Sequence, residues 1–337
     1  MQANHQETIF EIIKKQIGNE SLGVVVGDVL NISPDAVYRR SRSETHLSIY
    51  EIEKLSNHFN FSIDSIFGLR KNNVLFNFKP LKDFDFSMDV YIEGLLENVK
   101  MLKAQKNPEL VLSVNNIAIF QLLNYPHLVR FKLFFWAKTF LRLPEFENTL
   151  FDYEKISPKT FNTGLAALKL YCTIPSKEIY DSEFLRSFVR EIYYYYRSRL
   201  IKDPKYALYL LEVLDRFVDH LKLQAIAGKK FVSTTEPPAN GNNFEMYFNE
   251  TNNGNSTIYY CTENNEGIYI AHNIMNYVHT ADKEYIQDSL TTLNKQILNS
   301  SMISSSNEKE RNEFFFQLKK MINGVRLKIE ADLILED

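Results

Sequence analysis

The segment SPDAVYRRSRSE, which runs from Ser33 to Glu44, constrains the fold of this chain more than any other because it combines a helix start with a cluster of arginines. The Ser33 side chain can cap a helix, the proline after it fits a first turn, and Asp35 suits the positive end of a helix dipole. At helical spacing Val37 points toward a core. The opposite face presents Asp35, Tyr38, Arg39 and Arg42. The segment therefore predicts a short helix that buries one side and exposes an arginine-bearing side.

Four further short helices are predicted around this segment. Residues 7–17 carry an apolar stripe, and residues 22–30 form a second apolar stretch that is followed by a short turn, Asn31-Ile32. A capping box, Ser48-Ile49-Tyr50-Glu51, opens a fourth helix, and a fifth, shorter helix follows it. Five small helices within about seventy residues can close a compact core. A helix, a tight turn and a second, capped helix is the arrangement that places a helix in the major groove of DNA.

Residues 5–68 resemble the helix-turn-helix domain of phage-repressor-like transcription regulators, of a type common in Bacteroidetes. The resemblance is carried by ISPDAVYRR and by SIYEIEKLSNHFNFSIDSIF, and it covers about a fifth of the chain. The sequence departs from the family pattern at two positions, because Ser41 replaces an aliphatic residue and Ser43 replaces a helix-ending glycine. A positive φ is less favourable for serine than for glycine. These departures concern the end of the recognition helix.

The resemblance implies which side chains would contact DNA. The set expected at base edges or flanking phosphates is Ser33, Asp35, Ala36, Tyr38 and Arg39, and the set expected nearer the DNA backbone is Arg40, Arg42 and Ser43. Arginine suits both tasks because its planar fork can grip either a guanine edge or a phosphate. The alternative is that the three arginines form a solvated helix face without a ligand.

The charge of this domain predicts that two copies of it, here called heads, bind DNA together. Residues 1–70 hold seven Lys or Arg and nine Asp or Glu, so the domain is slightly acidic and its positive charge is concentrated on one helix. Because phosphate contacts supply most non-specific affinity, a single head of this kind should bind double-stranded DNA weakly, and two linked heads are expected. We therefore predict a homodimer whose contacts lie elsewhere in the chain.

Length and composition limit the number of domains and the class of protein that the whole chain can form. With 337 residues, 45% of them hydrophobic and 13% aromatic, the chain can form two or three domains with substantial cores. Its net charge of −3 favours no membrane or polybasic surface, and the polar start MQANHQET is unlike a signal peptide. We therefore expect a cytoplasmic protein, with Cys172 and Cys261 reduced. The usual nucleotide, zinc-protease and hydrolase motifs are missing from the sequence, so we expect no cofactor and no metal.

The hydrophobic pattern predicts a mostly α fold in several parts. After the helix-turn-helix domain at residues 1–68 we expect a linker at 69–88 that docks on its neighbour, and a helical bundle at 89–227. The region 228–337 should form a small antiparallel sheet and two long C-terminal helices, at about 281–300 and 307–331, packed on the bundle (α+β). The last helix should pack on the sheet or on a partner subunit.

Two groups of residues invite a catalytic hypothesis, and for both we favour a structural role. His220 stands near Asp215 and Asp219, but the two acids lie one turn apart on a helix that needs a polar face. Cys261 lies within about twenty residues of His272 and His279, yet no oxyanion loop or orienting group can be assigned. We therefore expect no enzyme activity.

Aromatic clusters in the bundle allow a sensory hypothesis. The run Tyr193–Tyr196 and the segment 130–140 most simply build core, and the alternative is a pocket for a small-molecule or protein effector. Taken together, the sequence predicts a dimeric, sequence-specific DNA-binding transcriptional regulator. The alternatives are a protein–protein interaction module that retains the helix-turn-helix fold, and an enzyme controlled by a DNA-binding head.

Overall fold

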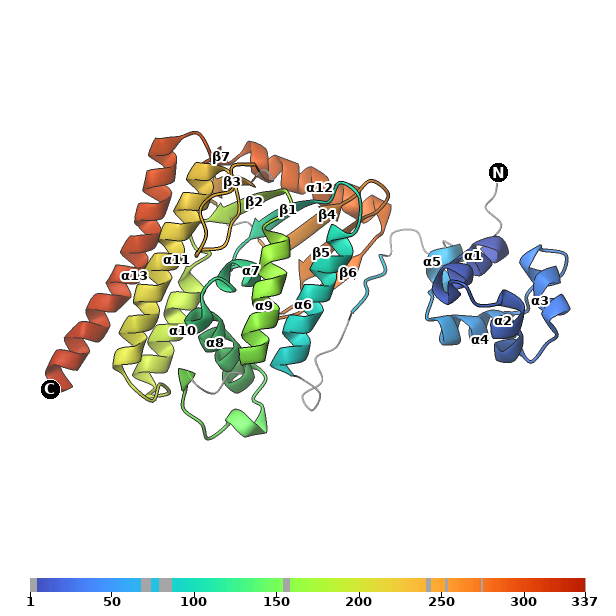
Figure 1. The fold of residues 1–337 in the computed structure, drawn as a ribbon, viewed down its shortest axis with the longest axis horizontal. Helices are drawn as coiled ribbons and strands as arrows, with labels where there is room; N and C mark the ends of the chain where they lie inside the picture. Colours follow the sequence, from blue (N-terminus) through green and yellow to red (C-terminus); the bar gives the residue numbers. More distant parts are fainter. Residues whose placement is uncertain are drawn as a thin grey trace. The chain divides into compact units, whose positions relative to one another are not determined.

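The computed structural model describes residues 5–67, 74–78, 87–153, 158–240, 244–251, 254–273 and 275–336. The chain divides into two compact units, Met1–Leu75 and Phe76–Asp337 (Figure 1). Each unit has its own hydrophobic core. Across the described ranges, no helix combines the length and the apolar character that crossing a membrane requires.

The first unit consists of five short helices: α1 (His5–Ile17), α2 (Leu22–Leu30), α3 (Pro34–Ser41), α4 (Ile49–Phe59) and α5 (Ile63–Phe67). They lie where the sequence pattern predicted them. Their apolar faces meet in one core, whose buried members are Ile9, Phe10, Ile13, Leu22, Val26, Leu30, Val37, Leu47, Leu55 and Phe59. The core of this bundle holds α3 through Val37, which is the one buried side chain of this helix.

Local signals set the helix ends in this unit. Asn31 takes the left-handed conformation, with φ of 57°, and ends α2, so that three residues separate α2 from α3. The predicted capping box of α4 is confirmed: the backbone N–H of Glu51 donates to Ser48 Oγ at 3.2 Å, and the backbone N–H of Ser48 donates to Glu51 Oε2 at 2.8 Å. These contacts fix the turn before α3 and the start of α4.

The second unit is built on a seven-stranded mixed sheet with the order β6-β5-β4-β1-β2-β3-β7. The strands are β1 (Glu109–Val114), β2 (Ser176–Asp181), β3 (Phe244–Asn249), β4 (Thr257–Cys261), β5 (Glu266–Ala271), β6 (Tyr277–Thr280) and β7 (Ser301–Met302). β1, β2 and β3 are parallel, and the remaining neighbours pair antiparallel. The parallel centre requires helical crossovers, and helices follow both β1 and β2 in the chain.

Helices cover both faces of this sheet. They are α6 (Met88–Lys103), α7 (Ile119–Leu122), α8 (Pro126–Phe135), α9 (Pro158–Tyr171), α10 (Arg186–Arg197), α11 (Lys205–Ala227), α12 (Lys283–Leu298) and α13 (Glu308–Glu336), and a π-helical turn at Trp136–Phe140 extends α8. α12 packs over one face, where Ile286 and Leu293 meet Ile179, Tyr259 and Ile268 of the strands. The main core lies on the other face and includes side chains of α6 to α11 and α13.

The prediction of a mostly α fold with a small antiparallel sheet is wrong. β1 and β2 lie inside the region that was predicted to be a helical bundle, and they form the centre of the mixed sheet. Because the strands of residues 89–227 and 228–337 pair with one another, these two regions belong to one unit. Both strands are only six residues long, and the charged side chains of β2 weaken its strand pattern. The two C-terminal helices are present as α12 and α13.

The predicted linker is described only at residues 74–78 and 87–88, and its other residues lie outside the described part of the chain. Asn77 pairs antiparallel with His279 of β6 through two backbone hydrogen bonds, of 2.6 and 3.0 Å. The ring of Phe76 contacts Tyr285, and that of Phe78 contacts His272. This short stretch therefore docks on the free edge of the sheet in its own unit.

Candidate nucleic-acid interface

The start of α3 is fixed by the residues that the sequence indicated. The backbone N–H of Ala36 donates to Ser33 Oγ at 3.3 Å, which confirms the predicted N-cap, and Pro34 occupies the first turn. Asp35 is exposed in the first turn, and Val37 is fully buried on the opposite side. The helix therefore has a fixed rotation about its own axis, with one side against the core.

Arg39 and Arg42 project from the exposed side of α3. Their side chains are 58% and 65% exposed, and the ring of Tyr38 lies partly exposed beside them. Arg39 and Arg42 therefore point outward as predicted, whereas the edge of the Tyr38 ring contacts Gly23 of α2. Two guanidinium groups with this freedom can reach a base edge or a phosphate.

Arg40 is held differently from its two neighbours. Its side chain is only 17% exposed, and Nη2 lies 2.9 Å from Oε1 of Glu51 on α4. Nη1 donates to the carbonyl of Ala36 at 3.2 Å. Arg40 therefore ties α3 to α4 and acts as a positioning residue rather than a free cation.

Glu44 partly neutralises the exposed arginines. One carboxylate oxygen lies 3.3 Å from Arg42 Nη1, and the other lies 3.9 Å from Arg39 Nε. All three side chains are about half exposed or more, so these ion pairs contribute about 0–1 kcal/mol and can be exchanged for a phosphate. Sequence reasoning did not identify this role of Glu44, although its position just after α3 is visible in the sequence.

α3 ends in the left-handed backbone conformation that favours glycine, although the residue at this position is Ser43. Ser43 has φ of 61°. Its N–H donates to the carbonyl of Arg40 at 2.9 Å, and the N–H of Glu44 donates to the carbonyl of Arg39 at 2.9 Å, which is a Schellman motif. The other departure, Ser41, donates its hydroxyl to the carbonyl of Tyr38 at 2.9 Å. The helix therefore ends at the expected residue although Ser43 is strained there.

The electrostatics of the α3–α4 junction favour the charged form of Glu51. Burial alone would raise the pKa of this carboxyl, but hydrogen bonds from Ser48 and Arg40 outweigh it and hold the pKa below its usual value. Glu51 therefore caps α4 and binds Arg40 as a carboxylate.

Gln6 is a residue of this site that sequence reasoning missed. Its Nε2 donates to the carbonyls of Arg40 and Thr45 at 2.7 and 2.8 Å, and its Oε1 accepts from the backbone N–H of Leu47 at 2.9 Å. One amide side chain thus links the end of α3 to the segment that joins α3 to α4. The partners stand more than thirty residues away in the chain, so no local signal could reveal them.

The suggested acid–base groups are separated in the structure. His220 is buried against Phe231, and burial lowers its pKa to about 4. Asp215 and Asp219 face α13 instead, where they form ion pairs with Arg326 and Lys319. Across the described ranges, no group of three or more His, Cys, Asp or Glu side chains could hold a metal ion.

Cys261 and His279 lie on opposite faces of the sheet. Cys261 belongs to the cluster under α12, whereas His279 stacks on Tyr260, which packs against the other core. Tyr260 and His279 also share a hydrogen bond of 3.1 Å. Burial raises the pKa of the Cys261 thiol, so the thiolate is disfavoured. A thiol–imidazole pair is therefore not formed by these residues.

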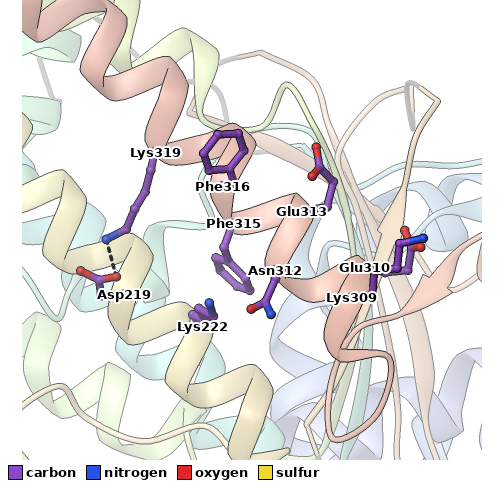
Figure 2. A pocket seen from close by; sticks show the side chains of 9 residues that line it. All are labelled: Asp219, Lys222, Lys309, Glu310, Asn312, Glu313, Phe315, Phe316 and Lys319. Carbon is purple, nitrogen blue, oxygen red and sulfur yellow. Dashed lines mark ion pairs between the residues drawn. The ribbon is translucent and has the colours of Figure 1, made fainter.

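The aromatic segments proposed as an effector pocket are filled by their own rings. Phe131 packs against Phe151, Phe188 and Tyr195 at centroid distances of 5.3 to 5.8 Å. Lys132 and Glu191 form a buried ion pair of 2.7 Å beside them. An open groove does lie between α11 and α13, and Figure 2 shows Phe315 between the two helices and the Lys319–Asp219 pair bridging them. Its lining is mostly charged, which differs from the apolar lining typical of ligand pockets.

Glu178 forms the centre of a buried polar cluster that the sequence did not reveal. It accepts hydrogen bonds from Tyr171, from Tyr180 at 2.6 Å and from Ser176 at 2.8 Å, and Lys230 Nζ lies 3.7 Å away in an ion pair. Burial lowers the pKa of Lys230 to about 8, against the opposing effect of Glu178. Groups of this kind can serve acid–base chemistry, but all five side chains are buried, so we interpret the cluster as a structural junction of β2, α9 and the segment after α11.

No family model, curated protein or solved structure matches this chain.

Proposed function

We propose that this protein is a sequence-specific DNA-binding transcriptional regulator that acts as a homodimer in the cytoplasm. The observation that carries the proposal is the orientation of α3: Val37 is buried beneath the helix, while Arg39 and Arg42 project from the opposite side. The resemblance of residues 5–68 to phage-repressor-like regulators supports the same function. Arg39 would read a base edge, Arg42 would grip a phosphate, and Arg40 would hold the helix in place.

The larger unit would supply the rest of this function. A head that is slightly acidic overall needs a second head for useful affinity, and residues 76–337 provide the mass through which two chains can associate. We assign dimerisation to this unit.

One observation favours a second candidate function, a protein-docking module. Ile49 and Tyr50, the first two residues of α4, are adjacent and strongly exposed. Large apolar side chains that stand together on a surface are typical of protein contacts. In that case any DNA affinity would arise without phosphate contacts and would vary little with salt concentration.

The proposal is tested by fluorescence anisotropy with the full chain, a duplex selected from a random pool and an unrelated duplex. Arg39→Ala should weaken binding to the selected duplex by about 1–3 kcal/mol and leave the unrelated duplex nearly unaffected. Arg42→Ala should weaken binding to both alike and reduce the salt dependence by about one counterion.

Lys15→Ala is the matched control because it removes an exposed positive charge from α1 and not from α3. This variant should bind both duplexes as the wild type does. If Arg39→Ala and Arg42→Ala bind as tightly as the control, the roles assigned to α3 are wrong.

A further inference from the structure

α13 has a second, exposed apolar stripe opposite the face that it buries. Its buried side chains are Phe314, Phe315, Leu318, Ile322 and Ile329, which pack into the main core. On the outer side Phe316, which also lines the groove beside α11, is 62% exposed, Leu327 is 56% exposed and Ile334 is 76% exposed. At 100° per residue these three side chains project within about 20° of one another. A surface helix normally carries one apolar face, so a second line of exposed apolar side chains is a candidate contact surface.

The stripe follows the spacing of a coiled-coil seam. Its positions alternate at four and three residues, and we name this set the α13 seam: Phe316, Lys320, Asn323, Leu327, Glu330 and Ile334. Spacings of three and four are those of a and d positions, at which helices interlock. The seam extends over about 27 Å at 1.5 Å per residue. The helix is already ordered by its packing on the unit, so a partner need not induce its folding.

The sequence of the seam is complementary to itself when two copies run antiparallel. With the two-fold axis beside position 325, Phe316 faces Ile334 of the second copy, and Asn323 faces Leu327. Lys320 then faces Glu330, and this pairing of opposite charges occurs twice. In a parallel pair, lysine would face lysine and glutamate would face glutamate, and such like-charge pairs are unfavourable. The charge pattern therefore selects the antiparallel arrangement.

Two observations show that this surface is available. Lys320 is exposed and Glu330 is partly exposed, and neither takes part in an ion pair among the described residues. Gly324 lies at the level of the two-fold axis on the flank of the seam, and a methyl group at this position would touch nothing within 4 Å in the single chain. Glycine inside an exposed helix costs about 1 kcal/mol relative to alanine, and its presence here suits the close approach of a second helix.

We propose that a second copy of this chain packs antiparallel along the α13 seam and forms a two-fold symmetric dimer. An isologous contact of this kind closes on itself and leads to no further assembly. This inference rests on contacts outside the first unit, and it would supply the dimer that the proposed regulator needs. Because it is tested by mass and not by DNA affinity, it can fail while the proposed function holds, and the reverse is also true.

The test is sedimentation velocity of the full chain over a wide range of concentrations. The wild type should pass from monomer to dimer. Lys320→Glu places glutamate against Glu330 of the second copy, and Glu330→Lys places lysine against Lys320, so each variant alone should raise the dimer Kd by about tenfold or more. An equimolar mixture of the two variants should recover wild-type dimerisation, because every facing pair then has opposite charges.

Asp332→Lys is the matched control: it makes the same charge change as Glu330→Lys at an exposed position of α13 outside the seam, and it should dimerise as the wild type does. Single variants that dimerise normally would overturn the proposal, as would a mixture that stays monomeric. A wild type that is monomeric at all concentrations would overturn it as well. Circular dichroism of each variant confirms that the helices are intact.

Discussion

The ring of Tyr38 packs against Gly23 so closely that a methyl group at position 23 would lie 2.9 Å from Cε2 of the ring. The same methyl group would lie 3.0 Å from Cβ of Pro34, at the start of α3. Both distances are shorter than ordinary van der Waals contact. The absence of a side chain at Gly23 therefore sets how closely α3 packs against α2.

Gly23→Ala should move α3 away from α2. Overpacking costs about 1–3 kcal/mol, and the better helix propensity of alanine returns up to about 1 kcal/mol, so we expect the first unit to lose roughly 1 kcal/mol of stability. Affinity for DNA should fall although no DNA-contacting side chain has changed. Chemical unfolding and anisotropy measure the two effects. A variant that is more stable than the wild type and binds equally well would contradict this account of the α2–α3 contact.

Ser43→Gly should stabilise the first unit. Ser43 has φ of 61°, and a non-glycine residue in the left-handed region costs about 1–2 kcal/mol, part of which is offset by the greater freedom of glycine in the unfolded chain. We expect a gain of about 0.5–1 kcal/mol in the free energy of unfolding. Ser21→Gly is the control, because Ser21 has an ordinary φ of −73°, and it should give no gain. Equal effects of the two changes would show that Ser43 is not strained.

Glu44→Gln should tighten DNA binding. The change removes a negative charge that lies 3.3 Å from Arg42 and 3.9 Å from Arg39, and it frees both cations for phosphate. We expect a gain in affinity of a few-fold at low salt that diminishes as the salt concentration rises. Glu20→Gln, a change of the same type in the turn between α1 and α2, should have a smaller effect. Weaker binding by Glu44→Gln would contradict the arrangement of charges proposed for the α3 face.

His220 should make the stability of the second unit depend on pH. Burial lowers the pKa of His220 to about 4 in the folded chain, whereas in the unfolded chain it has its ordinary value near 6.5. As the pH falls below about 6.5, the unfolded chain therefore binds this proton before the folded chain does. Stability is therefore lost as the pH falls from about 6.5 toward 4, and the loss from this group should reach about 2 kcal/mol at pH 5. His220→Phe should remove this contribution. If the difference in unfolding free energy between wild type and variant is the same at pH 7 and pH 5, His220 is not buried as a neutral imidazole.

The helices of the first unit could be placed from the sequence because their signals are local. The Ser33 cap and the Ser48–Glu51 box each act within three residues of the chain, and both are present as predicted. The outward face of α3 follows from helical spacing alone. The position of Arg40 could not be predicted, because Glu51 and Gln6, which hold it, belong to other helices.

The mixed sheet could not be predicted because its centre depends on contacts between residues that are distant in the chain. SKEIYD contains lysine, glutamate and aspartate, which argue against a buried strand, yet Glu178 is fully buried in β2. Its charge is tolerated because Tyr171 and Lys230 meet it from α9 and from the segment after α11. A strand that depends on such distant partners has no signature within its own six residues.

The most direct test of the central claim is selection of binding sites from a random pool of duplexes by the full chain. Two α3 helices that are related by a two-fold axis should enrich an inverted repeat whose half-sites are about 34–36 Å apart, one turn of DNA, or a multiple of that distance. Enrichment should be lost with Arg39→Ala. A pool that stays random with the wild-type protein at low salt would contradict the assignment of α3 as a DNA-recognition helix.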